Sequence, residues 1–98
     1  MIKHVVAFRF KEGVSDERRH KLLEEYNGFP IKFPEMRNFS IGKNISQRDN
    51  TFEYAFSVEF DDEAALKRYL SSAEHEDHVV NRFRPVIHAR AIVSYEVR

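Results

Sequence analysis

Apolar and polar residues alternate along four stretches of this sequence. In residues 2–10 the alternation places Ile2, His4, Val6, Phe8 and Phe10 on one face of an extended chain. A period of two is typical of a β-strand with one buried face. Similar patterns predict strands over residues 36–45, 52–60 and 88–97, and the polar residues 46–50 predict a turn that joins the second and third into a hairpin.

Two further segments carry apolar residues at helical spacing. The first helix is predicted over residues 16–27, where Ser15 can cap its amino terminus and Gly28 follows its last residue. The second helix follows Asp61 or Asp62 as a cap, and its inward stripe is predicted to contain Leu66, Tyr69, Leu70 and Ala73. Between the first helix and the second strand, residues 29–34 contain two prolines and predict an irregular, packed connection.

The segment after the second helix predicts a break and a further short helix. Ser71 and Ser72 interrupt the apolar stripe, and the short helix is expected to begin at Glu74. Its inward side is predicted to carry His75, Val79, Phe83 and, beyond a kink at Pro85, Val86, with His78 at the margin.

The order of these elements is β-α-β-β-α-β, which predicts a ferredoxin-like α+β fold with a four-stranded antiparallel sheet and the helices on one face. The opposite face carries Val5, Ala7, Ala55 and one parity of the last strand. A mixed apolar surface of this size needs a cover, so we expect a homodimer that packs sheet against sheet.

Composition narrows the functional classes. The 98 residues fit one domain, residues 1–98, and 16 basic residues balance 16 acidic ones, so no broad basic field favours nucleic acid or a membrane surface. The chain has no cysteine, which excludes disulfides and a thiol nucleophile. The amino terminus lacks a signal-peptide core and no apolar run is long enough to span a membrane, so we expect a soluble, cytoplasmic protein.

Several residues carry chemistry but also have structural interpretations. His4 lies among apolar residues, where a histidine hydrogen-bonded within the core is the alternative to a functional one. Residues 74–78 place two histidines near acidic residues, but a solvated acidic first turn explains them better than a metal site does. Arg82, Arg84 and Arg90 could bind an anionic ligand or pair with nearby acids.

Three groups of residues occur together in a familiar order, namely the run from Met1 to Val6 with Phe8 and Phe10-Lys11, then Gly42-Lys43-Asn44-Ile45-Ser46, then Tyr69-Leu70 followed by His75. In these residues the chain resembles the stress-responsive A/B barrel domain family. The resemblance implies a dimeric α/β barrel, and in one plant branch of the family it implies a cofactor-free polyketide cyclase. The residues that match the pocket of that branch are His4, Tyr69 and His75.

By resemblance His75 is the base, Tyr69 positions or donates a proton, and His4 orients or polarises the ligand. Phe8, Leu66 and Val79 are expected as apolar ligand-binding walls of the same pocket, with no metal and no cofactor. Family members often carry His-Pro where this chain has Ser72-Ala73 and a histidine where it has Tyr54. These differences predict altered helix geometry before His75 and an altered pocket wall.

Three functional hypotheses follow. The first is a stress-associated dimer that binds a small apolar or carbonyl-bearing ligand, and the second is a cofactor-free cyclase or lyase. The third is a monooxygenase similar to other dimeric α+β barrels, for which His88 is the candidate to bind haem.

Overall fold

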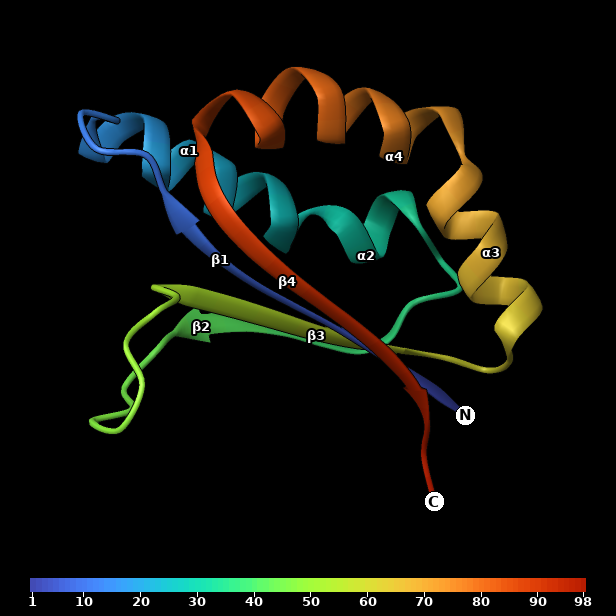
Figure 1. Ribbon diagram of the computed structural model, residues 1–98. Coiled ribbons are helices and arrows are strands. Elements are labelled where there is room, and N and C mark those ends of the chain that lie inside the picture. The colour runs from blue at the N-terminus through green and yellow to red at the C-terminus, as the bar shows by residue number, and fades with distance from the viewer.

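The four strands form one antiparallel sheet, and every helix lies on the same side of it (Figure 1). The computed structural model describes residues 1–98. The strands, in the sheet order β2-β3-β1-β4, are β1 (Ile2–Phe10), β2 (Arg37–Lys43), β3 (Tyr54–Phe60) and β4 (Ile87–Glu96). The helices are α1 (Asp16–Asn27), α2 (Phe29–Lys32), α3 (Glu63–Ser71) and α4 (Ala73–His78). The predicted ferredoxin-like α+β fold is confirmed.

The alternation of β1 sets which side chains face the helices. Every second residue from Ile2 to Phe10 is buried and those between are half-buried. In the register of the sheet His4 lies between Val58 of β3 and Ser94 of β4, so both of these residues share its face. The hydrophobic core therefore lies between this face and the helices.

The predicted caps form at both longer helices. The Ser15 side chain accepts a hydrogen bond from the Arg18 amide, and the Asp62 carboxylate accepts one from the Ala65 amide. Each cap satisfies an amide that the helix itself leaves without a partner. Gly13, before α1, has φ of 84°, a left-handed backbone that glycine adopts without steric cost.

Several elements differ from the sequence predictions. Phe29–Lys32 forms a short helix rather than an irregular connection. Pro30 is compatible with this helix because it lies in the first turn, where a backbone amide would have no partner within the helix. The second and third strands are shorter than predicted, and Ile45 lies outside β2 with 91% of its surface exposed. The helix after the serine break begins at Ala73, capped by the Ser72 side chain, which leaves Ala73 exposed rather than on the inward stripe of α3.

The segment between α4 and β4 changes its winding twice. Val79–Phe83 forms a π-helical turn and Arg84–Val86, which contains Pro85, forms a 3-10 turn. Such turns are often found at functional sites. His78, expected at the margin of its helix, is instead buried, because it faces α1.

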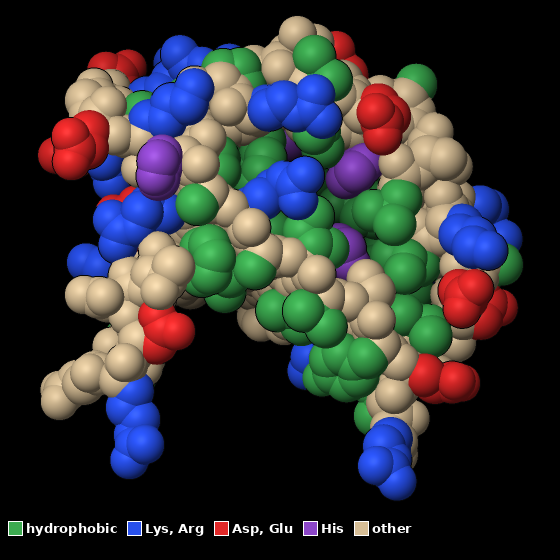
Figure 2. Space-filling model, viewed as in Figure 1, with side chains coloured by type: hydrophobic (Ala, Val, Ile, Leu, Met, Phe, Trp, Pro, Cys, Tyr) green, Lys and Arg blue, Asp and Glu red, His purple; other side chains and the backbone are tan.

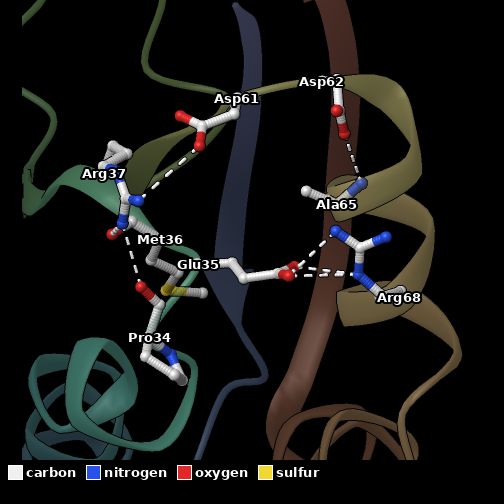
Figure 3. Close-up of polar contacts among 8 residues, drawn as sticks. All are labelled: Pro34, Glu35, Met36, Arg37, Asp61, Asp62, Ala65 and Arg68. Carbon is white, nitrogen blue, oxygen red and sulfur yellow. Dashed lines mark hydrogen bonds and ion pairs between the residues drawn. The ribbon is translucent and has the colours of Figure 1, made fainter.

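A group of ion pairs fixes the connection between α2 and β2 against the elements around it (Figure 3). The Arg68 guanidinium of α3 binds both carboxylate oxygens of Glu35, with nitrogen–oxygen distances of 2.9 to 3.2 Å. Arg37 lies 3.6 Å from the Asp61 carboxylate at the end of β3. Both ends of this connection are therefore tied to α3 and β3.

The outer face of the sheet carries no helix. Val5, Ala7 and Ala55 are half-buried there, and Val93 and Tyr95 of β4 are 56% and 46% exposed. None of the helices combines the length and the apolar character that crossing a membrane requires.

Candidate functional site

A cavity of about 240 Å³ opens between the helices and the inner face of the sheet. The space-filling view shows a hollow lined by hydrophobic side chains, with histidines inside it and basic side chains near its opening (Figure 2). The polar lining residues are His4, Tyr26, Tyr69, His75, Glu76, His78, Arg84, Arg90 and Ser94, and the rest of the lining is aliphatic or aromatic. This volume is below the range of pockets for drug-sized ligands, so the cavity suits a small molecule.

His4 is held in one orientation at the sheet side of the cavity. Its Nδ1 lies 2.7 Å from the Ser94 hydroxyl, which β4 brings beside it in the register of the sheet. Only 2% of the residue is exposed. Burial, assisted by repulsion from His75, lowers the pKa of His4 from 6.5 to about 4. The ring is therefore neutral at physiological pH.

Tyr69 brings the two histidines of the candidate site together. Its ring centroid lies 6.2 Å from that of His4 and 4.5 Å from that of His75. The three residues come from β1, α3 and α4, and all of them line the cavity. The grouping that the family resemblance implied is thus present in this chain.

A hydrogen bond to the backbone sets the proton position on His75. Its Nδ1 lies 3.1 Å from the Leu70 carbonyl oxygen, which can only accept a hydrogen bond, so Nδ1 carries the proton. Burial lowers the pKa of His75, although this carbonyl and Glu76 oppose the shift. In the neutral ring Nε2 then has a free lone pair, as a general base requires.

Two tyrosines provide hydroxyl groups to the same cavity. Burial raises the pKa of Tyr69, and burial together with the nearby Tyr69 raises the pKa of Tyr26. Both phenols stay protonated at physiological pH and can donate a hydrogen bond to a ligand oxygen. Tyr26 was not predicted as a site residue, because its place on the apolar stripe of α1 is typical of a core residue.

The predicted apolar walls divide between cavity and core. Val79 lines the cavity. Phe8 is fully buried and stacks against Tyr54, with its centroid 5.9 Å away, while Leu66 is buried in the same core. Neither Phe8 nor Leu66 belongs to the cavity lining, and the two rings of the lining that pack against Phe8 are those of Tyr26 and Phe83.

An ion-pair cluster lies beside the cavity; the sequence left open that Arg82 pairs with an acid but did not identify Glu25 as its partner. Glu25 of α1 accepts hydrogen bonds from Arg82, at 2.6 Å, and from His78 Nε2, at 3.0 Å. The hydrogen bond from Arg82 lowers the pKa of Glu25, and attraction to Arg82 and His78 lowers it further, whereas burial opposes this shift. The cluster links the π-helical turn to α1. Arg82 binds Glu25 in this cluster and does not line the cavity.

The remaining candidates are placed as follows. His75 and His78 point to different partners, Leu70 and Glu25, and no group of three histidine or acidic side chains is arranged to hold a metal ion. Arg84 and Arg90 both line the cavity. His88 is exposed on β4 and does not contribute to the lining.

The lowered pKa of His4 predicts a loss of stability in mild acid. The histidine binds a proton near pH 6.5 in the unfolded chain, but His4 in the folded protein binds one only near pH 4. The contribution of His4 to the free energy of unfolding is therefore fully present above pH 6.5 and is lost as the pH falls from 6.5 to 4. The expected contribution is up to about 3 kcal/mol. Urea unfolding at pH 7 and pH 4.5, at one protein concentration, measures it.

The matched variants for this measurement are His4→Asn and His20→Asn. His4→Asn should reduce the pH dependence of the free energy of unfolding, whereas His20→Asn should leave it unchanged, because the His20 side chain is 74% exposed. An unchanged pH dependence in His4→Asn would contradict a buried, neutral His4.

Comparisons with known proteins identify relatives of this chain. A family model described as Stress responsive A/B Barrel Domain matches residues 2–97. An uncharacterized protein of Streptomyces coelicolor is 31% identical over 78 residues, which span 78% of this chain and 80% of the relative.

Two solved protein structures are examples of proteins with the same fold. A dimeric ferredoxin-like protein of unknown function from Thermobifida fusca has a TM-score of 0.82 at 19% identity, with 98% of this chain and 90% of that chain covered. A hydroxynitrile lyase from Passiflora edulis has a TM-score of 0.88 at 19% identity, with 99% of this chain and 93% of that chain covered. At these identities the likeness concerns the fold.

Proposed function

Because the chain belongs to the stress responsive A/B barrel domain family, we propose that it is a homodimeric protein that binds a small carbonyl-bearing ligand in the cavity between helices and sheet. The observation that carries this proposal is the convergence of His4, Tyr69 and His75 on one small, largely apolar cavity. An enclosed apolar space with a few placed polar groups is the usual form of a small-molecule site.

The polar groups of the cavity suit a carbonyl oxygen. No hydrogen bond within the chain involves the Tyr69 or the Tyr26 hydroxyl, and both residues line the cavity. A phenol that stays protonated donates a hydrogen bond to a carbonyl oxygen, which has two lone pairs to accept one. The aliphatic and aromatic lining then covers the apolar part of the ligand.

A second candidate function is the cleavage of a hydroxyl-bearing substrate to such a carbonyl compound, with His75 as the base, and the hydrogen bond from His75 to Leu70 favours it. With Nδ1 bonded to the carbonyl, His75 Nε2 can take a proton from a hydroxyl group beside a carbon–carbon bond. As that bond breaks, the electron pair of the O–H bond forms the carbonyl, and the leaving carbanion takes the proton from the imidazolium. Tyr69 stabilises the developing charge on oxygen. The Passiflora edulis neighbour is a hydroxynitrile lyase, which is consistent with chemistry of this class on this fold.

The homodimer is proposed from the uncovered face of the sheet. Ala7 pairs with Ala55 and with Ala91 across the middle of the sheet, and Val5 pairs with Val93. Small side chains at the centre allow a second sheet to approach closely, and burying exposed apolar groups such as Val93 provides a driving force. The Thermobifida fusca neighbour, which is described as dimeric, supports this assembly.

A thermal-shift screen of small aldehydes and ketones tests the proposed binding, since a ligand of the native state raises the melting temperature by mass action. The variant His75→Asn removes Nε2 but keeps a side-chain amide that can donate to the Leu70 carbonyl. We expect it to fold normally, to bind hits from the screen about tenfold more weakly, and to lose any turnover, because general base catalysis contributes about 10²- to 10⁴-fold.

His20→Asn on the surface of α1 is the matched control and should behave as the unaltered protein, because its side chain is 74% exposed. Hits whose affinity is the same in His75→Asn and in the unaltered protein would remove His75 from the site. A melting temperature that no carbonyl compound raises would contradict the binding function itself.

A further inference from the structure

Two arginines of the cavity have no partner within the chain. Four other arginines lie within ion-pair distance of a carboxylate, namely Arg19, Arg37, Arg68 and Arg82. Arg84 and Arg90 form no ion pair and no side-chain hydrogen bond, yet both line the cavity beside its apolar wall. Arg84 and Arg90 are both exposed, so the open side of the cavity carries two charged guanidinium groups that have no ion-pair partner in the chain.

The chain path places both arginines at the same end of the cavity. Arg84 begins the 3-10 turn that leads directly into β4, and Arg90 is the fourth residue of β4. On the inner face of β4, Arg90, Ile92 and Ser94 follow one another at every second position. Ser94 is bonded to His4, so the Cα atom of Arg90 lies roughly 13 Å from the histidine end of this strand.

The helical wall has the same order of side chains. His75 of α4, Val79 and Phe83 of the π-helical turn, and then Arg84 line the cavity in sequence. The helical wall therefore runs from His75, and the β4 wall from the serine bonded to His4, each through an apolar middle to an arginine. Glu76, also in the lining, is adjacent to His75 and places a negative charge at the histidine end.

We propose that the carbonyl ligand carries an anionic oxygen group, a carboxylate or a phosphate, which Arg84 and Arg90 bind while its carbonyl lies among Tyr69 and the two histidines. This inference rests on the proposed function and adds the class of ligand and its direction. A guanidinium binds a carboxylate or a phosphate through paired hydrogen bonds, which fix geometry as well as charge. Glu76 repels an anion from the histidine end, so the ligand has one favoured orientation.

The test compares three probes of similar size by isothermal titration calorimetry. Benzoylformate carries a carbonyl next to a carboxylate, 1-phenyl-1,2-propanedione replaces that carboxylate by a neutral acetyl group, and phenyl phosphate carries a phosphate instead. We expect the unaltered protein to prefer an anionic probe over the neutral diketone by about tenfold or more at low salt, as charge-assisted hydrogen bonds provide.

The variants are Arg84→Gln, Arg90→Gln and the double variant, with Arg18→Gln on the exposed surface of α1 as the control. Each cavity variant should reduce the preference for the anion, the double variant should abolish it, and the neutral diketone should bind all of them equally. A preference for phenyl phosphate over benzoylformate that the double variant loses supports the inference and identifies phosphate as the anion.

The opposite outcomes separate this inference from the proposed function. One contrary outcome is that the diketone binds and that benzoylformate and phenyl phosphate bind no more tightly than it does. Another is that the preference for the anion persists in the double variant. Either outcome would show that the arginines do not recognise an anion, while the proposed carbonyl site would remain supported. If none of the probes binds, the carbonyl site and the anion site are both contradicted.

Discussion

Replacing Phe8 by alanine should destabilise the protein by about 3–5 kcal/mol, the usual cost of removing a fully buried aromatic ring. Phe8 has no exposed surface, and its ring packs against Phe10, Tyr26, Tyr54 and Phe83. The ring contacts side chains from the sheet, from α1 and from the π-helical turn, so the surrounding structure has little freedom to close the space. Chemical denaturation at fixed protein concentration measures the loss.

Phe8→Leu keeps most of the apolar volume and should lose less stability than Phe8→Ala. If the alanine variant does not fold, the leucine variant still allows the loss of stability to be measured. Val80→Ala is the surface control, since Val80 is 48% exposed and should change stability by less than about 0.5 kcal/mol. Stability unchanged by Phe8→Ala, with ligand affinity lost, would make Phe8 a cavity wall, as the sequence suggested, rather than a core residue.

Replacing Ala7 or Ala55 by glutamate should dissociate the proposed homodimer. The two residues are paired across β1 and β3 on the uncovered face, at the centre of the proposed interface. An unpaired charge buried there costs several kcal/mol, which weakens association on the order of a thousandfold. Sedimentation equilibrium across a range of micromolar concentrations measures the change in dissociation constant.

Ala64→Glu provides the same substitution on an exposed surface of α3 and should leave association unchanged. Circular dichroism shows whether each variant keeps its secondary structure. Association like that of the unaltered protein in both Ala7→Glu and Ala55→Glu, or a monomer before any substitution, would contradict an interface on this face.

Much of the fold was predictable because its determinants are local. The alternation of residues 2–10 specified β1 and its buried face, Ser15 specified the start of α1, and the pair Asp61 and Asp62, of which Asp62 is the cap, placed the start of α3 within one residue. The short helix Phe29–Lys32 was missed, because a proline in the first turn of a helix and one in a loop are alike in sequence. The family resemblance is confirmed, and it alone brought His4, Tyr69 and His75 to notice together.

The parts of the site that sequence could not predict depend on long-range geometry. His78 was expected at a margin, but Glu25, more than fifty positions away, gives it a buried partner. Phe8 shares its strand face with His4, yet it lies in the core, where it packs against the lining rings Tyr26 of α1 and Phe83 of the π-helical turn. Periodicity gives the face on which a side chain lies, whereas the packing of other elements decides whether that face is core or cavity.

The position of β4 at an edge of the sheet has a consequence for kinetics. This strand supplies Ser94, Ile92 and Arg90 to the cavity, but it is hydrogen-bonded only to β1. A strand with one neighbour separates locally at lower free energy than a central strand does, so transient opening of β4 would widen the existing opening of the cavity without unfolding of the core. Bound ligand would then slow amide hydrogen exchange in β4 more than in β1, and the exchange rates of this one strand would report occupancy.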